Sequence, residues 1–451
     1  MFTVAIAYTL AFILVSLFYV VVINRFVINF SLNEINAYSF SLLYTCFIFV
    51  FPGVVIIASG YFSESPYSYL VSGDNKTLAA ISVLASLVMF AIFSSLWCKL
   101  FGSIAMPYLK VEYKGESNAI KLFYNIIHYL AILLFVYVLY KMGGNVPLLS
   151  LISGDIKQAA IQRSEFRFGG SDLITNVFAA NIIPLSCLLS YCRLKVSSNA
   201  SSSVKFKLKF RFFFSFILTS LYLLIDTQKA PVLVLIISLI LIRIYFSGFS
   251  WKYVFAALSI FSISVALYAS TKSFGFEDMD YLIFRVLNRL FISSVGGLFV
   301  SFEVFPNIID KGYILQGLPN ILFSIFDADS VNSAKDVMIF INGDNPELGV
   351  QNSYYMAGGW ASLNLLSFLV APAVVSANFY LFHRLVALIP QNVFAFKLAF
   401  YFNFMLLLNF NADYRSFSYF LIFQVPVVIL LFISFFYFSI KRFYVVFRKE
   451  K

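Results

Sequence analysis

The feature that most constrains this chain is a series of long, nearly uncharged apolar runs. A helix needs roughly 20 apolar residues to cross the hydrocarbon core of a bilayer, and about eleven runs approach or reach that length. A helix is suited to this setting because it satisfies its own backbone hydrogen bonds without water. The runs lie at residues 2–23, 37–60, 77–98, 119–140, 173–192, 212–226, 230–247, 252–270, 353–383, 391–410 and 417–440. The sequence therefore predicts an all-α polytopic membrane protein with about 11–12 transmembrane helices.

Composition and charge narrow the function classes further. Hydrophobic residues make up 61% of the chain, whereas a soluble domain is apolar at about 45–50% of positions. The net charge of +11 comes from Lys and Arg near helix ends, which is typical of anchors facing anionic lipid. Membrane lipids are thus expected partners, and nucleic acid is not. The four cysteines fit no zinc or disulfide spacing, so we expect them to pack as small hydrophobes.

The distribution of Lys and Arg predicts the orientation of the spans. Residues 193–211 and the tail 441–451 are strongly basic, so both are expected in the cytoplasm. If residues 99–121 and the turn 383–392 are also cytoplasmic, the number of predicted crossings agrees with the sides assigned to the basic segments. The N-terminus is then external. The count holds only if the apolar run 281–305 does not span the membrane. Nearly half of the acidic residues then lie in one large external loop.

Two arginines decide how the run 281–305 is interpreted. Arg285 and Arg289 lie one turn apart, on a different face from the apolar residues around them. Each would cost about 2.5–3.5 kcal/mol at the middle of a bilayer. An amphipathic helix on the outer surface avoids that cost, so we predict a surface helix. If the run spans instead, the basic tail lands outside, against its charge.

These assignments divide the chain into five parts. The loops are predicted to be external, on the periplasmic side, and the tail cytoplasmic. The parts are N-terminal transmembrane helices at 1–140, an external loop with an Arg pair at 141–172, central transmembrane helices at 173–270, a large external loop with an amphipathic helix at 271–352, and C-terminal transmembrane helices with a basic tail at 353–451.

Pairs of arginines in the two external loops are the strongest functional signal. Arg163 and Arg167 are four residues apart, so a helix would present both on one face. Arg285 and Arg289 repeat that spacing. Guanidinium groups match the oxygens of a phosphate, and two pairs brought together would clamp a pyrophosphate. The alternative is that they anchor the interface, contact lipid headgroups or pair with nearby acids.

Two short external turns carry further polar candidates. Asp226 and Lys229 interrupt two apolar runs, and Lys229 would add a donor to the same anionic site. The alternative is a hairpin turn that merely needs polar residues and Pro231. In the last external turn, Arg415 is a candidate for substrate binding, and the alternative is a simple pair with Asp413.

Aromatic and acidic residues complete the set of candidates. Tyr354 and Tyr355 precede a Gly-rich span, where flat rings would suit a sugar; the alternative is the interfacial aromatic belt. The loop 271–352 offers Asp280 and Glu303 as candidate general bases, although most of its acids are expected to be solvated surface. His128 and His383 are expected to be hydrogen-bonded structural residues. We find no nucleotide-binding or metal-binding motif, so no cofactor and no metal site are predicted.

The layout over about 140–385 resembles a known family. It combines an arginine-bearing external loop, the polar turn Asp226–Pro231 between short helices, a large late external loop and the Gly-rich aromatic segment Ser353–Leu366. Together these features resemble the Wzy-type O-antigen and capsular polysaccharide polymerases. These form the oligosaccharide repeat unit polymerase family, which is related to the O-antigen ligases.

The resemblance implies a GT-C-like bundle in the bacterial inner membrane with glycosyltransferase activity. Such an enzyme polymerises undecaprenyl-pyrophosphate-linked oligosaccharide repeat units into O-antigen of lipopolysaccharide, or into capsule, at the outer face. Its partners would be the lipid-linked donor and acceptor glycans and a chain-length regulator. Arginines in external loops are functional in the family, which by position implies roles for Arg163, Arg167, Arg285 and Arg289. The related ligases use a histidine in the large loop, and residues 271–352 contain none.

Elementary chemistry agrees with that implication. Breaking a sugar–pyrophosphate bond develops negative charge on the leaving group, and fixed cations stabilise that charge. Glycosyl transfer of this kind can proceed without a metal, because the donor is already activated. A lipid-linked oligosaccharide flippase is the main alternative, and a transporter should show repeated halves and ionisable residues near the midplane. An O-antigen ligase-type transferase is the other.

Overall fold

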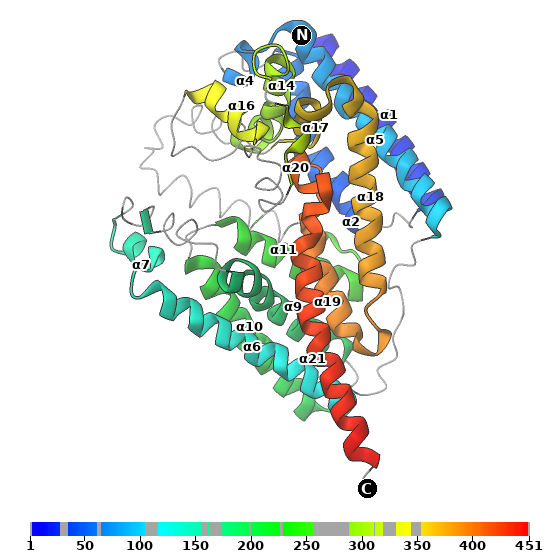
Figure 1. Ribbon diagram of the computed structural model, residues 1–451. Helices are drawn as coiled ribbons and strands as arrows, with labels where there is room; N and C mark the ends of the chain where they lie inside the picture. The colour runs from blue at the N-terminus through cyan, green and yellow to red at the C-terminus, as the bar shows by residue number, and fades with distance from the viewer. Residues whose placement is uncertain are drawn as a thin grey trace. The chain divides into compact units, whose positions relative to one another are not determined.

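The structure is a computed structural model in which helices and short connections account for the described residues (Figure 1). No β-strand occurs in that part of the chain. The described residues are 2–27, 35–60, 65–103, 116–155, 158, 161–162, 173–197, 200–225, 229–253, 255, 259, 288–310, 312–318, 331–343 and 353–449.

The chain divides into two compact units, each described separately. Unit 1 comprises residues 1–106, 250–384 and 407–422, and unit 2 comprises residues 107–249, 385–406 and 423–451. The helices of unit 1 are α1 (Phe2–Phe26), α2 (Ala37–Phe40), η1 (Ser41–Val50), α3 (Phe51–Ala58), α4 (Pro66–Tyr69), α5 (Gly73–Phe101), η3 (Asn288–Ile292), α14 (Ser293–Val304), η4 (Tyr313–Leu315), α16 (Ser333–Asn342), α17 (Met356–Leu363), η5 (Asn364–Leu366), most of α18 (Ser367–Ala387), α20 (Tyr414–Phe417) and most of η8 (Ser418–Phe423). Those of unit 2 are α6 (Asn118–Met142), α7 (Pro147–Ile152), η2 (Ile174–Ala179), α9 (Ala180–Val196), α10 (Ser202–Ile225), α11 (Lys229–Ser247), η6 (Gln391–Val393), α19 (Phe394–Phe404), most of η7 (Met405–Leu407) and α21 (Gln424–Lys449).

Eight helical segments among the described residues are long and apolar enough to cross a membrane, which confirms the all-helical, multi-pass character. They are Thr3–Arg25, Ala37–Ala58, Gly73–Phe101, Asn118–Met142, Ile174–Val196, Ser202–Ile225, Met356–Ala387 and Tyr414–Arg442. Two expected spans differ, and a third is not tested. Pro231–Ser247 is a shorter apolar helix. The run 391–410 contains α19, which passes into a 3₁₀ turn and then into non-helical backbone. Most of 252–270 lies outside the described residues.

An aromatic cluster around Phe90 of α5 forms the core of unit 1. The Phe90 ring centroid lies 5.9 Å from that of Tyr19, 5.8 Å from Tyr38, 5.1 Å from Phe379 and 4.9 Å from Phe410. Aromatic pairs at such distances contribute about 0.5–1.5 kcal/mol beyond the area they bury. The cluster therefore joins α1, α2, α5, α18 and the non-helical segment that follows η7.

In unit 2, the buried helix α9 packs against α6, α10 and α19. Cys187 and Cys192 are buried in α9, and Cys46 and Cys98 are also buried; none of the four forms a disulfide among the described residues, so the prediction that all four pack as small hydrophobes is confirmed. The Nδ1 atom of His128 lies 3.2 Å from the Ser186 hydroxyl and is also bonded to Ser215. His128 is thus a hydrogen-bonded structural residue, as expected.

Each unit has a polar contact between helix ends that are predicted to be cytoplasmic. In unit 1, Arg384 near the end of α18 donates to the carbonyl oxygens of Phe101 and Gly102 at the end of α5. In unit 2, Arg193 forms a two-pronged ion pair with Glu116, with N–O distances of 3.0 and 2.5 Å. Within unit 1, the end of α5 therefore lies beside the end of α18, and within unit 2, Glu116 lies beside the end of α9. Which side of the membrane they face stays a prediction.

Residues 288–304 differ from the predicted surface helix. Val295, Leu298, Phe299 and Val300 of α14 are buried inside unit 1. A Cβ built on Gly296 would lie 2.4 Å from the ring of Tyr67, so the helix packs closely on that side too. The reason is that Ser293–Val304 is mostly apolar, with Glu303 its one charged residue, which favours a buried helix over a surface one. The preceding residues 281–287 lie outside the described part.

Two stretches of non-helical backbone run through the interior of unit 1. The first is Ser353–Tyr355, where the Tyr354 hydroxyl lies 2.9 Å from that of Ser86, near the middle of α5. The second is 408–413, whose Phe410 carbonyl accepts from the Tyr355 backbone N–H at 2.8 Å. At membrane depth such backbone is tolerated only where it is buried in protein or lines a cavity. These stretches therefore mark where unit 1 departs from a simple bundle.

Close packing of α3 against η3 and α14 makes a testable prediction. A Cβ at Gly53 would lie 2.3 Å from the Phe291 carbonyl oxygen and 2.4 Å from Val295, whereas one at Gly73 meets no heavy atom within 4 Å. Gly53→Ala should lower stability by about 1–3 kcal/mol through overpacking. Gly73→Ala should leave it unchanged or slightly raised. Thermal unfolding of both purified variants in detergent measures this, and equal midpoints would contradict the packing.

Candidate functional site

Most of the predicted arginine clamp lies outside the part of the chain that the structure describes. The Arg163, Arg167, Arg285 and Asp226 positions are among the undescribed residues. Lys229 begins α11 and Arg289 lies in η3, but neither side chain is described. The convergence of two arginine pairs on one diphosphate therefore stays a prediction. The described candidates are Glu303, Tyr354, Tyr355 and Arg415, and all of them belong to unit 1.

Glu303 caps the N-terminus of α5. Its Oε2 atom accepts from the Ser72 N–H and hydroxyl, both at 2.9 Å, and from the Asn75 amide at 2.8 Å. Carboxylates are favoured at helix N-termini, where backbone N–H groups have no partner within the helix. Burial raises the pKa of Glu303, but the hydrogen bonds from Asn75 and Ser72 outweigh it and hold the pKa below its ordinary value. These contacts give Glu303 a structural role as a helix cap, and its lowered pKa makes it a weaker base.

Tyr354 and Tyr355 are fully buried. Their ring centroids lie 4.7 Å apart, and both rings approach Phe410. The Tyr355 hydroxyl contacts the Ser86 carbonyl oxygen at 3.5 Å. The two rings thus pack into the aromatic core of unit 1, and in this arrangement neither presents a face to a sugar.

Arg415 and Asp413 form the ion pair that the sequence left open as an alternative. The Arg415 Nε lies 3.8 Å from the Asp413 Oδ2, and the Arg415 backbone N–H donates to Oδ1 at 3.1 Å. The Arg415 side chain is 36% exposed, whereas that of Asp413 is 8% exposed. Burial raises the pKa of Asp413, against the charge and the backbone N–H of Arg415, which lower it. The pair therefore combines an accessible cation with a buried carboxyl group.

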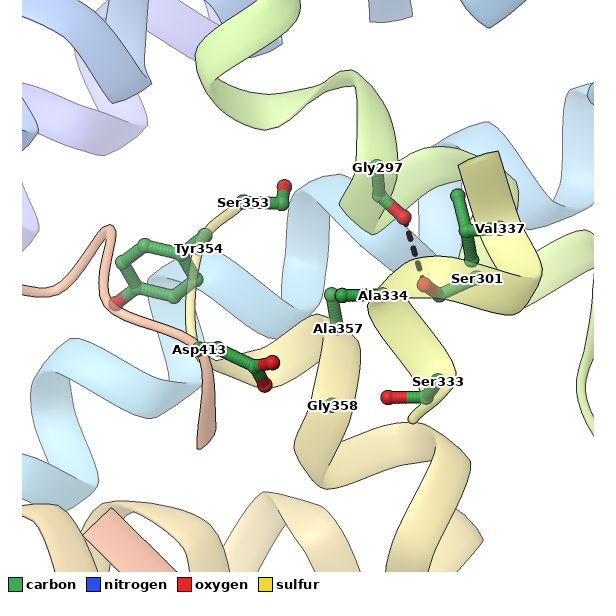
Figure 2. Close-up of a pocket in the computed structure, with 10 residues that line it drawn as sticks. All are labelled: Gly297, Ser301, Ser333, Ala334, Val337, Ser353, Tyr354, Ala357, Gly358 and Asp413. Carbon is green, nitrogen blue, oxygen red and sulfur yellow. Dashed lines mark hydrogen bonds between the residues drawn. The ribbon is translucent and has the colours of Figure 1, made fainter. Parts of the chain in front are cut away.

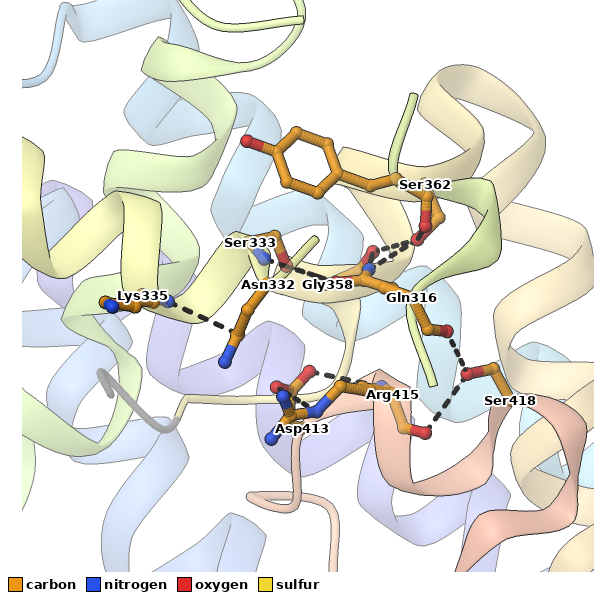
Figure 3. Close-up of polar contacts among 10 residues, drawn as sticks. Gln316, Asn332, Ser333, Lys335, Gly358, Ser362, Asp413, Arg415 and Ser418 are labelled. Carbon is orange, nitrogen blue, oxygen red and sulfur yellow. Dashed lines mark hydrogen bonds and ion pairs between the residues drawn. The ribbon is translucent and has the colours of Figure 1, made fainter. Parts of the chain in front are cut away.

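Gln316 links four polar segments around this pair, as Figure 3 shows. Its side-chain amide donates to the Gly358 carbonyl oxygen of α17 at 2.8 Å and to the Ser362 hydroxyl. Its Oε1 accepts from the Ser333 hydroxyl at the start of α16, also at 2.8 Å. The Ser418 hydroxyl donates to its backbone carbonyl oxygen at 2.8 Å. Gln316 is fully buried, so it fixes η4, α16, α17 and η8 as one polar body.

No sequence motif points to Gln316, although one sequence signal, Gly317, lies beside it. Gly317 has a φ of +92°, a conformation that L side chains rarely adopt. A Cβ there would lie 2.4 Å from both the Arg415 carbonyl oxygen and the Ser418 hydroxyl. Glycine thus lets the chain turn and approach the segment that carries Arg415. The glycine is visible in the sequence, but its partner segment is not.

A second buried bond ties the same region together. The Tyr313 hydroxyl donates to the Asp336 Oδ2 at 2.5 Å, which joins η4 to α16. Burial, followed by the bond to Asp336, raises the pKa of Tyr313, so its hydroxyl stays protonated. A donor aimed at a carboxylate in this way makes a strong, charge-assisted hydrogen bond.

A small cavity lies where these elements meet (Figure 2). Its volume of about 10 Å³ is roughly the least that holds one water molecule. The Asp413 Oδ2 atom is buried and makes no hydrogen bond among the described residues. The lining residues come from α14, α16, α17 and the two non-helical stretches: Gly297, Ser301, Ser333, Ala334, Val337, Ser353, Tyr354, Ala357, Gly358 and Asp413.

The Gln316 linkage generates a prediction about stability. Gln316→Ala removes the side-chain hydrogen bonds to three residues and leaves their buried polar groups unpaired. Each such group that water does not reach lowers the free energy of unfolding by about 1–3 kcal/mol. We expect a clear fall in the unfolding midpoint. Gln391→Ala, at an exposed position, is the matched control and should have little effect. Indistinguishable midpoints would contradict the role of Gln316.

The capping contact of Glu303 predicts a pH dependence. Because its pKa is lowered in the folded state, its stabilisation is present above the ordinary glutamate pKa and is lost as pH falls through the folded value. Glu303→Gln should lower the free energy of unfolding by about 0.5–2 kcal/mol near neutral pH. The variant should also lose less stability than the unsubstituted protein as the pH falls. The measurement is unfolding against pH for Glu303→Gln, Ser72→Ala and the double variant. Purely additive effects would argue against a direct bond.

Comparison of the chain with protein-family models, with curated proteins and with solved structures found no match. The site is accordingly defined by its own geometry: a partly exposed arginine side chain, a buried carboxyl group and a small polar cavity, held together by Gln316 within unit 1.

Proposed function

We propose that this protein is an integral membrane glycosyltransferase that polymerises undecaprenyl-pyrophosphate-linked repeat units into O-antigen or capsular polysaccharide. The proposed location is the outer face of the bacterial inner membrane. The multi-pass helical architecture, the loop arginines and the layout of the chain support this reading. Donor and acceptor glycans, each carried on a lipid, are the proposed substrates.

The observation that carries the proposal is the fixed position of Arg415. Its backbone N–H is bound by Asp413, and its carbonyl oxygen accepts from Ser418 at 3.1 Å. Its side chain is 36% exposed, which leaves guanidinium N–H groups accessible to a ligand. A cation held in place before the reaction stabilises charge as it develops, without reorganisation during the reaction. Arg415 is therefore a candidate contact for the diphosphate leaving group.

The proposed reaction needs no change in oxidation state. A hydroxyl oxygen of the acceptor glycan attacks the anomeric carbon of the donor, and the bond from that carbon to the diphosphate oxygen breaks. The electron pair of this bond leaves with undecaprenyl diphosphate, and the hydroxyl proton passes to a base or to water. Arg163, Arg167, Arg285 and Arg289 are proposed to neutralise the leaving group alongside Arg415. Glu303 is not proposed as the base, because its contacts are those of a helix cap.

One observation favours a second candidate function, a lipid-linked oligosaccharide flippase. Transporters place their binding sites at interrupted helices near the midplane. Unit 1 has non-helical backbone beside Ser86, near the middle of α5, and the buried carboxyl group of Asp413 at a cavity. This feature is compatible with transport, whereas the exposed cation at Arg415 favours transfer chemistry.

Deletion of the gene in its own host separates these functions. A lost polymerase should leave single repeat units on the surface glycan carrier, whereas a lost flippase should leave no surface glycan. A lost ligase should leave long chains that are still lipid-linked. Electrophoresis of surface glycan, together with analysis of the lipid-linked pool, distinguishes the three outcomes, and unchanged glycan in all fractions would remove all three proposals.

Substitution of arginines in the complemented strain tests the proposed site. Arg415→Ala should reduce chain extension by roughly 10²-fold or more, the usual cost of losing one preorganised donor, and Arg163→Ala and Arg285→Ala should also abolish it. Lys335→Ala is the matched control, because Lys335 is an exposed cation on the neighbouring helix α16. Protein levels are measured in parallel. Normal extension in Arg415→Ala would remove that residue from the site, and normal extension in Arg163→Ala and Arg285→Ala would end the arginine-clamp proposal.

A further inference from the structure

We infer that the cavity of unit 1 binds a single monovalent cation, of the sodium class, with the Asp413 carboxylate as its charged ligand. This inference does not rest on the proposed function, because it follows from the chemistry of the cavity lining. The residues that line this cavity all belong to the described part of unit 1.

The first observation is an unsatisfied carboxylate oxygen. The Asp413 side chain is 92% buried, since 8% of it is exposed, and its Oδ2 atom accepts no hydrogen bond among the described residues. Figure 2 shows the carboxylate directed from the 408–413 stretch toward α17. A buried charged oxygen without a hydrogen bond is costly, so a partner of positive charge or with a proton to donate is favoured there.

The second observation is that the surrounding hydroxyls present oxygen lone pairs. The Ser301 hydroxyl donates its proton to the Gly297 carbonyl oxygen at 2.7 Å, and the Ser333 hydroxyl donates to Gln316 at 2.8 Å. Their oxygens are therefore available only as acceptors. The Ser353 oxygen accepts from the Leu298 N–H at 2.9 Å and keeps one lone pair. An acceptor-rich lining of this kind suits a hard cation, which binds oxygen ligands.

The charge and size of the cavity select the class of cation. Among the described residues, Asp413 is its one acidic lining residue, and no Lys or Arg lines it. The Arg415 backbone N–H donates to the Asp413 Oδ1 at 3.1 Å, and the Arg415 Nε forms an ion pair with Oδ2 at 3.8 Å without a hydrogen bond; Arg415 is not part of the lining. No group of three or more His, Cys, Asp or Glu residues suited to a metal occurs in the described part, so a divalent ion would be poorly neutralised. Space for one water molecule fits one small dehydrated ion.

The third observation is the backbone that frames the cavity. Ser353 and Tyr354 belong to one non-helical stretch and Asp413 to the other, and the two are joined by the bond from the Tyr355 N–H to the Phe410 carbonyl oxygen. Unwound backbone of this kind is where membrane proteins coordinate sodium ions. A bound ion would connect α14, α16 and α17 to the 408–413 stretch, so binding should stabilise the folded protein.

The test uses the full-length protein purified in detergent, with sodium chloride as the probe. Thermal unfolding is measured over a sodium chloride series in which N-methylglucamine chloride keeps the ionic strength constant. We expect a saturable rise of the midpoint with sodium, and a smaller rise or none with potassium chloride. A flat response to sodium, or an equal response to every chloride salt, would overturn the inference and would leave water as the occupant.

Variants then assign the response to the cavity. Asp413→Asn should abolish the sodium dependence, whereas Asp310→Asn, at an exposed position, should keep it. Ser301→Ala retains the charge and should raise the half-saturating sodium concentration by at least about tenfold. Sodium dependence that persists in Asp413→Asn would overturn the assignment. If Asp413→Asn does not fold, an unchanged half-saturating concentration in Ser301→Ala would do so alone.

Discussion

The organisation of unit 1 depends on which partners form hydrogen bonds with the backbone polar groups where its helices are interrupted. Helices satisfy their own backbone, but the Ser353–Tyr355 and 408–413 stretches cannot, and water is excluded from a membrane core. Their carbonyl oxygens are instead bonded by neighbouring groups: Ser41 donates to Leu408 at 2.7 Å, and the Tyr355 N–H donates to Phe410. Most polar groups are satisfied in this way. Among the described residues of the 408–413 stretch, the side-chain oxygens Asn411 Oδ1 and Asp413 Oδ2 are exceptions, and of these two only Asp413 lines the cavity.

Gln316 has a related role for the region that precedes α17. A single amide side chain has both donors and an acceptor, so it can bridge segments that share no direct backbone pairing. Its contacts with Ser333, Gly358 and Ser362 combine with the contact from Ser418 to its carbonyl oxygen. A buried network that is fully satisfied in this way favours one arrangement over its alternatives. Arg415 is thereby carried on a fixed body rather than on a free turn.

Some of the fold and the site could be predicted from local sequence, and the failures have physical causes. Apolar runs predicted eight of the spans, because membrane insertion depends on length and hydropathy. The run 281–305 differs from its prediction in its later part: Arg285 and Arg289 suggested a surface helix, but the mostly apolar residues 293–304 are buried as α14, while residues 281–287 lie outside the described part. The run 391–410 was read as one span, although α19 ends at Phe404. Glu303 was a candidate general base because it is an acidic residue of the predicted large loop, whereas its contacts with Ser72 and Asn75 make it a helix cap.

The sequence by itself determined that this is a helical, multi-pass membrane protein. Long apolar runs are stable in a bilayer only where their backbone hydrogen bonds are made internally, and helices do this. The sequence also predicted the pairing of Asp413 with Arg415 as one of two alternatives, because the two are near neighbours in one turn, and the structure shows that pair. Only the tertiary structure decided that Gln316 is a junction, that Tyr354 and Tyr355 are core residues, and that Asp413 faces a cavity. These properties arise from contacts between residues far apart in the chain, and no local pattern of residues specifies which distant segments will meet.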